Sequence, residues 1–299
     1  MTRPTFGWVL SPAARAPEGA ATLHAENRRF LERIQGAIDT VWVEDHFQWG
    51  ERPVVEGWTA LTYWAAQRPE LRFGTLVLGQ SYRNPALVAK LFATLHWLRG
   101  GRLIAGVGAG WKRDEYEAYG WPYPSAKIRL EQLEDAVQIL RAMWSSSPAT
   151  YHGRHYSIQD AYCEPRIDPM PPLLIAGAGE RVTLRLAARF ADWMNIPFRD
   201  YDTTARKLDV FERHGRELGR SLDDVTRSYY AFLSVTRDAT PPEPRPDLHM
   251  IWGTPDSVAA QMRRFAALGI EHFMLRFVDF PSQTGLDLFL EQVLPQLRG

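Results

Sequence analysis

Short apolar runs alternate with amphipathic stretches along most of the chain. Several of the runs are apolar at every position, which is typical of strands that are covered on both faces of a parallel sheet. Together the runs predict eight strands, over residues 5–10, 40–44, 72–78, 102–108, 173–176, 192–196, 228–236 and 272–278.

The stretches between these runs carry apolar residues at intervals of three and four, which is the spacing of a helix buried on one face. Phe30, Ile34 and Ile38 are spaced in this way, and so are the apolar residues within 130–144 and 258–268. A helix also often begins at an N-cap residue followed by a first-turn proline. Such starts are predicted at Asn84–Pro85 and at Thr254–Pro255.

Eight alternations of strand and helix in 299 residues predict an α/β fold, a (β/α)8 TIM barrel that forms a single domain over residues 1–299. A doubly wound open sheet is the alternative. Residues 149–158 predict a β-hairpin that turns at Gly153, within an insertion of hairpin plus helix between strands four and five. The proline-rich residues 238–247 predict a loop where the helix after strand seven is expected.

Composition excludes several classes of partner. Lys plus Arg and Asp plus Glu both number 35, and the chain has no basic run that could follow a phosphate backbone, so nucleic acid is not expected. The single cysteine, Cys163, excludes an internal disulfide and a multi-cysteine metal site, and no metal is predicted. The apolar run near the N-terminus is too short for a signal peptide or a membrane span, which predicts a cytoplasmic protein without membrane contact.

Ionisable residues follow the second and third predicted strands. In a TIM barrel the active site lies at the C-terminal ends of the strands, so Glu44, Asp45 and His46 are expected at the barrel mouth. The structural alternative is that Asp45 caps a turn and His46 packs beneath it. Arg83 and Asn84 follow the third strand and are expected at the same mouth.

Small residues follow the fourth predicted strand. Gly106, Gly108 and Gly110 allow the backbone to approach a flat or anionic ligand, and Trp111 offers an aromatic face. The pattern lacks the third glycine of a dinucleotide-binding fingerprint and does not follow the first strand, so it is weak evidence for that kind of site.

The fifth strand leads into a second small-residue turn. Gly177, Ala178 and Gly179 come directly before a predicted helix, whose free N–H groups and dipole favour a phosphate. Arg181 and Thr183, in the first helical turn, would add to this anion site. A purely structural turn between strand and helix is the alternative.

Five segments gain meaning when they are taken together: "TVWVEDHFQW", "LRFGTLVLGQSYRNPALVAKLFATL", "GGRLIAGVGAGWKRDEYEAYGWPYP", "PPLLIAGAGERVTLRLAARFADWMNIPF" and "GTPDSVAAQMRRFAALGIEHFMLRF". In this order the chain resembles the luciferase-like monooxygenase superfamily, and within it the branch of F420-dependent oxidoreductases. The resemblance implies a TIM barrel, usually a homodimer, that holds a flavin or the deazaflavin coenzyme F420 with its ring in the barrel mouth.

The resemblance also implies roles for individual positions. Asp45 and His46 match an Asp-His pair of F420-dependent sugar-phosphate dehydrogenases, in which "DHFQ" is also followed by a tryptophan, here Trp49. Leu76 and Val77 match a bulge in strand three, often a non-proline cis peptide, that supports the back of the ring. The other matches are the loop near the ring and ribityl chain, at Gly108, Ala109 and Gly110, and the phosphate-binding turn, at Gly177, Ala178, Gly179, Glu180 and Arg181.

Two positions depart from that pattern. Trp111 stands where those dehydrogenases carry a glutamate proposed as proton donor, so their substrate is not carried over. Glu44 replaces a residue that is commonly small, and it would supply a carboxylate from one strand earlier. A solvent-facing or ion-paired acid is the alternative for Glu44.

The first functional hypothesis is an oxidoreductase that transfers a hydride between F420 and a small, apolar or aromatic organic substrate. His46 is the expected proton donor or acceptor, Asp45 would orient its ring or bind the polar edge of the cofactor, and Glu44 is the third catalytic candidate. The substrate pocket is expected to contain Trp49, Trp111, Arg83, Asn195 and Arg276, although an ion pair beneath the mouth is the alternative for Arg276.

Two rival hypotheses keep the same fold. In one, reduced FMN captures dioxygen and the protein is a monooxygenase. In the other, the protein binds a flavin without turnover, as a silent subunit. The intact pair of Asp45 and His46 argues against the silent subunit, since such a subunit has no need of an acid-base pair.

Overall fold

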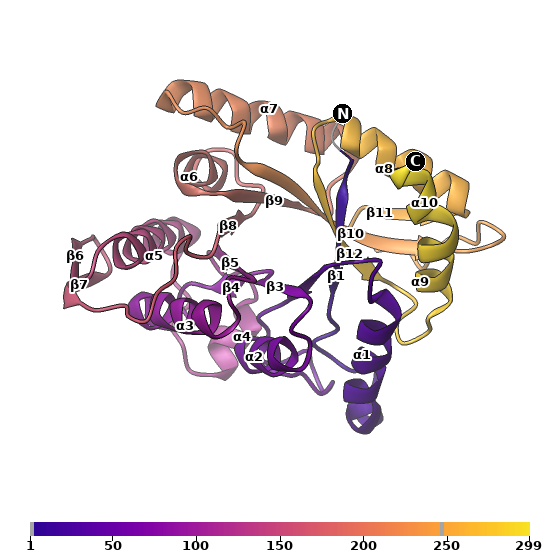
Figure 1. The fold of residues 1–299 in the computed structure, drawn as a ribbon, viewed down its shortest axis with the longest axis horizontal. Helices are drawn as coiled ribbons and strands as arrows, with labels where there is room; N and C mark the ends of the chain where they lie inside the picture. Colours follow the sequence, from indigo (N-terminus) through magenta and orange to yellow (C-terminus); the bar gives the residue numbers. More distant parts are fainter. Residues whose placement is uncertain (1–2, 246–247) are drawn as a thin grey trace.

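The computed structural model describes residues 3–245 and 248–299. Eight parallel strands close into a barrel surrounded by helices, as the sequence predicts (Figure 1). The barrel closes where β12 pairs with β1, with His272 opposite Thr5. Its strands, in spatial order, are β1 (Thr5–Val9), β2 (Thr40–Val43), β3 (Arg72–Thr75), β5 (Leu103–Gly108), β8 (Leu173–Ala176), β9 (Trp193–Pro197), β10 (Thr226–Val235) and β12 (His272–Phe277).

The third predicted strand is interrupted near its end. The peptide bond between Leu76 and Val77 is cis, as the resemblance implies, and it separates β3 from the two-residue strand β4 (Leu78–Gly79). Pairing then resumes between β4 and β5, with Gly79 opposite Gly108. The interruption exposes part of Val77 to the mouth while Leu76 stays buried.

The proline-rich residues form a loop over 238–245, as predicted, but this loop does not take the place of a helix. It leads into an unpredicted strand, β11 (Met250–Gly253), that pairs with the C-terminal half of β10. Helix α8 (Pro255–Ala267) then takes the place between the seventh and eighth barrel strands. Residues 246 and 247 lie outside the described part of the chain.

Helices form the outer layer around the strands (Figure 1). The predicted N-caps are confirmed, because the Asn84 side chain accepts from the amides of the first turn of its helix and Thr254 does the same for α8. Ile38 is buried but lies beyond the end of the first helix, so the helix is shorter than predicted. The remaining helices are η1 (Pro17–Gly19), α1 (Ala20–Ile34), α2 (Gly57–Gln67), α3 (Pro85–Leu98), α4 (Arg113–Ala118), α5 (Ala126–Ser145), α6 (Thr183–Phe190), α7 (Tyr201–Leu218), α9 (Thr284–Leu288), η2 (Phe289–Val293) and α10 (Leu294–Arg298).

The predicted hairpin is present between the fourth and fifth barrel strands. Strands β6 (Ala149–His152) and β7 (Ser157–Ala161) are antiparallel, and the amide of Gly153 donates to the carbonyl of Tyr156 in the turn. The hairpin packs beside α5, where the buried carboxylate of Asp135 accepts from the hydroxyl of Tyr151 and the amides of His155 and Tyr156 (Figure 1).

One large side chain, that of Trp42, lies inside the barrel. Trp42 is fully buried, and it fits because its neighbours are glycines. A Cβ on Gly7 would lie 2.3 Å from Trp42 Nε1, and a Cβ on Gly74 would lie 2.4 Å from Trp42 Cζ3. The indole N–H donates to His272 Nε2 at 3.0 Å. No helix in the described ranges is long and apolar enough to cross a membrane.

Candidate active site

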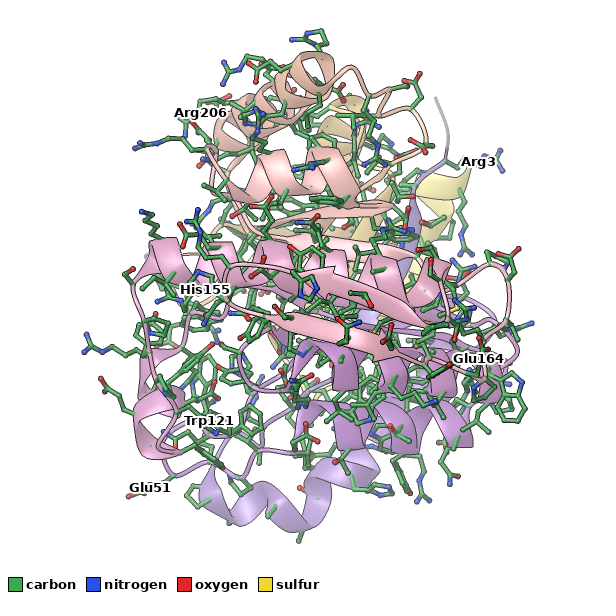
Figure 2. All side chains as sticks on the ribbon, turned by 90° about the vertical axis from the view of Figure 1, so that its left-hand side faces the viewer. Arg3, Glu51, Trp121, His155, Glu164 and Arg206 are labelled. Carbon is green, nitrogen blue, oxygen red and sulfur yellow. The ribbon has the colours of Figure 1, made fainter. Side chains whose placement is uncertain are left out.

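The residues that follow the strands gather on one side of the molecule. Figure 2 shows Glu51, which follows β2, Trp121, which follows β5, and Arg206, which follows β9, toward the left, whereas Arg3 and Glu164, which precede β1 and β8, lie toward the right. The loops after the strands therefore share one rim, where a TIM barrel places its active site.

Three consecutive ionisable residues after β2 point to three different partners. Glu44 continues the inward direction of Trp42, two residues earlier, and its carboxylate accepts from Arg276 at 2.6 Å. Asp45 turns outward and binds Arg83. His46 lies beside a carboxylate that the sequence analysis did not single out, Glu115 of α4.

His46 and Glu115 form a buried pair. Nδ1 of His46 lies 3.2 Å from both carboxylate oxygens of Glu115, which also accepts from the amides of Phe47 and Gln48. Burial opposes charge on His46, but the hydrogen bond to Glu115 and the charges of Glu44, Glu115 and Asp45 outweigh it, so the pKa of His46 is raised. Within the described ranges, Nε2 of His46 has no hydrogen-bond partner. This nitrogen is therefore available to a ligand.

The carboxylate that contacts the His46 ring belongs to Glu115 and not to Asp45. The sequence predicts that Asp45 orients the His46 ring or binds the polar edge of the cofactor, and in the structure Glu115 holds that ring. Burial raises the pKa of Glu115, but the hydrogen bonds from His46 and from the backbone outweigh it, so the net pKa is lowered. Glu115 lies in the run "RDEYEA", which has the composition of an exposed helix, and it is nevertheless fully buried.

Asp45 and Arg83 form an ion pair on the outer side of the β2 end. Arg83 Nη1 and Nη2 lie 2.9 and 3.0 Å from the two carboxylate oxygens of Asp45, and the amide of Gly79 donates to Asp45 at 3.0 Å. Burial raises the pKa of Asp45, and Arg83 and Gly79 oppose that rise. Arg83 also contacts Glu56, the N-cap of α2. Arg83 therefore supports a buried acid rather than facing the substrate, which corrects its expected place.

Two tryptophans flank His46, as expected for walls of a pocket. The ring of Trp49 lies edge-on to His46 with centroids 5.0 Å apart, and the ring of Trp111 does so at 5.8 Å. Trp49 is 37% exposed and Trp111 is 65% exposed. The exposed indole of Trp111 beside a buried histidine offers a surface for a flat or apolar ligand, whereas the ring of Trp49 already carries the cations of Arg52 and Lys112.

A cavity of about 580 Å³ opens over β1, β2, β10 and β12, and we call it the mouth cavity. Glu44 and Arg276 lie in its wall, and Glu44 also accepts from the hydroxyl of Tyr230 at 2.9 Å. Arg276 thus forms the ion pair that was the alternative to a ligand contact, while still facing the cavity. The pKa of Tyr230 lies well above its ordinary value because of burial and the charge of Glu44.

Asn195 lies deeper than the sequence analysis expected. It is 1% exposed, inside the barrel, and its Nδ2 donates to Ser228 Oγ at 3.1 Å. It does not line the mouth cavity. The strand β9 extends to Pro197, so the position of Asn195 is within the strand rather than at its end.

The other half of the mouth is made of small and apolar residues. Leu76, Val77 and Ala176 belong to one apolar cluster, and with Ala109, which follows Gly108, we call them the shelf; all but Leu76 are partly exposed. Gly108 of β5 adjoins the shelf, and a Cβ there would lie 2.6 Å from Val77 Cγ2. The backbone of β5 can therefore lie this close to Val77 only because residue 108 has no side chain. An open apolar shelf of this kind fits the face of a planar ring.

The turn after β8 adjoins a second cavity, of about 520 Å³, which we call the turn cavity. Gly179 lies in its wall together with the cations Arg199, Arg206 and Lys207. These cations come from the β9–α7 region and were missed, because they lie some twenty residues after the turn. Arg181, the expected cation, is exposed and lies outside this wall.

Two details of the predicted phosphate turn differ from expectation. The helix begins at Thr183 rather than directly after Gly179, and Glu180 binds Lys207 at 2.7 Å. The Gly177 amide donates to the carbonyl of Asn195, so it is not free for a ligand. The cations of the turn cavity nevertheless fit a phosphate, and the shelf fits a ring, which together suit a flavin or F420.

Comparison with known proteins agrees with this arrangement. A sequence profile described as luciferase-like monooxygenase matches residues 5–241. A relative from Beutenbergia cavernae, named F420-dependent glucose-6-phosphate dehydrogenase, is 36% identical, and the alignment covers 89% of this chain and 90% of the relative. A protein of the same name from Intrasporangium calvum is 28% identical, with 98% of each chain covered.

Two solved structures share the fold. An F420-dependent secondary alcohol dehydrogenase in complex with an F420-acetone adduct has a TM-score of 0.83 and 22% identity, with 100% of both chains covered. The F420-dependent tetrahydromethanopterin reductase from Methanopyrus kandleri has a TM-score of 0.81 and 18% identity, with 99% of this chain and 100% of that chain covered. The profile match spans well over half of the sequence, and the chain therefore belongs to the luciferase-like monooxygenase family.

Proposed function

We propose that this protein is an F420-dependent oxidoreductase that transfers a hydride between the coenzyme and a small organic substrate. The observation that carries the proposal is the position of His46, which is buried against Glu115 and flanked by the exposed ring of Trp49. The names of the relatives support the choice of coenzyme, since both are called F420-dependent.

The two halves of the mouth have separate tasks in this proposal. The shelf supports the coenzyme ring, and the turn cavity holds its phosphate through Arg199, Arg206 and Lys207. When bound, F420 supplies the hydride donor or acceptor. The mouth cavity takes the substrate, with Trp49 in its wall.

His46 handles the proton that accompanies hydride transfer. Its Nδ1 is held by Glu115, which leaves Nε2 to donate a proton to the substrate oxygen or to accept one from it. The raised pKa of His46 keeps its ring protonated to higher pH than an ordinary histidine, and this suits a proton donor for reduction of a carbonyl. Asp45 and Arg83 keep the end of β2 in place.

The substrate class is the second part of the proposal. The relatives are named for glucose 6-phosphate, but Trp111 stands where the resemblance places their proton-donating glutamate. The wall of the mouth cavity combines aromatic side chains and prolines, among them Phe232, Phe277 and Pro241, with charged and hydroxyl side chains. The apolar part of this wall, together with the change at Trp111, leads us to expect a small substrate with an apolar or aromatic body.

Anaerobic turnover tests the proposal. Purified protein is titrated with F420 and with FMN side by side, and each complex is then mixed with a panel of secondary alcohols without oxygen. The proposal expects tighter binding of F420 and reduction of the coenzyme by at least one alcohol. Preferential binding of FMN, with product formed only after oxygen is admitted, would instead indicate a monooxygenase.

A further inference from the structure

Arginines gather around the mouth cavity in excess of the acids there. Four arginines, Arg15, Arg52, Arg245 and Arg276, lie in its wall with two acids, Glu44 and Glu243. Arg276 is paired with Glu44, whereas Arg52 and Arg245 form no ion pair with an acid among residues 3–245 and 248–299. The proline-rich loop before β11 brings Arg245 to this place.

Both of these arginines are held against aromatic rings. The guanidinium carbon of Arg52 lies 5.5 Å from the ring centroid of Trp49, and that of Arg245 lies 5.7 Å from the ring of Phe232. Stacking of this kind fixes a guanidinium in place and leaves its N–H groups free to bind. The two residues come from loops that are far apart in the sequence and face the same cavity.

The positive charges at this site repel one another. Burial lowers the pKa of Arg52, and the charges of Arg245 and Arg276 lower it further. The carboxylate of Glu44 accepts from Arg276 and Tyr230 and forms no ion pair with Arg52 within the described residues. Glu243, on the loop, is exposed to solvent. An anion that entered the cavity would therefore be attracted by the guanidinium groups of Arg52 and Arg245, which have no acid as a partner.

We propose that the substrate carries an oxyanion, a carboxylate or a phosphate, which Arg52 and Arg245 bind while its apolar body lies against Trp49 and Phe232. This inference rests on the proposed function for the location of the substrate. It adds a charged group to the expected small apolar substrate, and it places that group at Arg52 and Arg245, in the same cavity as the Glu44–Arg276 pair.

Calorimetric titration of the F420-saturated protein with matched probes tests this inference. Benzoate and phenyl phosphate carry the two kinds of oxyanion, and benzamide is a neutral analogue of benzoate. The inference expects at least one anion to bind roughly tenfold or more tightly than benzamide, the size of effect that a hydrogen bond to a charged group produces. The tighter of the two anions identifies carboxylate or phosphate as the preferred group.

Variants then locate the anion. Arg52→Gln and Arg245→Gln should each weaken binding of the preferred anion by roughly tenfold and leave benzamide unchanged, whereas Arg52→Lys, which keeps the charge, should lose less. Arg28→Gln, on the exposed face of α1, is the matched control and should behave as the parent protein. Circular dichroism confirms that each variant is folded.

Two results would overturn the inference: equal binding of benzamide and the anions, or unchanged anion binding in the double variant of Arg52 and Arg245. The same titrations without F420 separate this inference from the proposed function. Anion binding without any coenzyme binding would refute the proposed function alone. Coenzyme binding without anion binding would refute the inference alone.

Discussion

The two halves of the barrel mouth are built from opposite kinds of residue. The shelf consists of small and apolar residues, and the backbone beside it approaches so closely that Gly108 has no room for a side chain. The mouth cavity carries large charged groups, among them the ion pair of Glu44 and Arg276. The contrast agrees with the proposed function, in which the shelf takes the flat ring of the coenzyme and the charged cavity takes the substrate.

The boundary between the halves is the end of β2. There His46 is held by Glu115, and its neighbour Trp49 already belongs to the mouth cavity. In the proposed function, the residue that carries the proton has to lie between the coenzyme and the substrate, and His46 has this position. Changes on each side of this boundary should therefore affect different measurements.

The largest effect is expected at the boundary itself. His46→Gln should lower kcat by roughly a hundredfold to ten-thousandfold, because the proton donor is lost, while the dissociation constant of the coenzyme stays near that of the parent. Anaerobic steady-state kinetics and a coenzyme titration check both halves of this statement. A variant with parent-like kcat would remove His46 from the mechanism.

Loss of the ion pair between Glu44 and Arg276, in the mouth cavity, is expected to lower the stability of the fold strongly. Arg276→Met should destabilise the fold by about 3–5 kcal/mol, because it leaves the carboxylate of Glu44 largely buried without its cation. The double variant Glu44→Gln with Arg276→Met should recover most of that loss. Urea unfolding measures the stability, and coenzyme affinity should change little in either variant. A strong loss of coenzyme affinity would show that the halves are not separate.

A smaller effect is expected at Gly179, in the wall of the turn cavity that is proposed to hold the phosphate. Gly179→Asp should weaken coenzyme binding by at least about tenfold, because its carboxylate repels the phosphate. Gly179→Ala separates shape from charge and should lose less, although its Cβ would lie 2.9 Å from Thr183 Oγ1. Gly36→Asp, in an open loop, is the control for an added acid. An unchanged dissociation constant in Gly179→Asp would move the phosphate elsewhere.

The smallest effect concerns pH. Glu115→Gln removes the hydrogen-bonded carboxylate that raises the pKa of His46, so that pKa should fall. The rate of alcohol oxidation, which needs neutral His46, should then rise at lower pH than in the parent. Glu117→Gln, on the exposed face of the same helix, is the control and should leave the profile in place.

The same pair links stability to pH. Because the pKa of His46 is raised from 6.5, its contribution to stability is complete below pH 6.5 and is lost as pH rises through the raised value. Because the pKa of Glu115 is lowered from 4.5, its contribution is complete above pH 4.5 and is lost as pH falls through the lowered value. Urea unfolding should therefore show the greatest loss for Glu115→Gln between pH 4.5 and 6.5, and a loss independent of pH would contradict this pairing.

The shelf half could be predicted from the sequence to a large extent. Continuous apolar runs gave the eight strands, and small residues after them, such as Gly108 and Gly177, marked the places where the backbone is close to other groups. The break in β3 at Leu76–Val77 came from the family resemblance rather than from periodicity. A run of apolar residues looks the same whether or not its pairing is interrupted.

The partners of charged residues could not be predicted in the same way. Glu115 was missed because an acid in a short charged helix looks exposed, and only the fold buries it against His46. Arg83 and Asp45 were both placed at the mouth, but their mutual contact could not be deduced from separate strand ends. Arg52 was missed because nothing in its local sequence shows that it faces a cavity.

The separation of the two halves is tested most directly by a crystal structure of the protein with F420 bound. The ring is predicted to lie against Leu76 and Val77, with its phosphate in the turn cavity beside Gly179 and with the mouth cavity left open beside Trp49. A ring seated in the mouth cavity, or a phosphate bound by Arg52, would contradict the division of the mouth and with it the assigned role of His46.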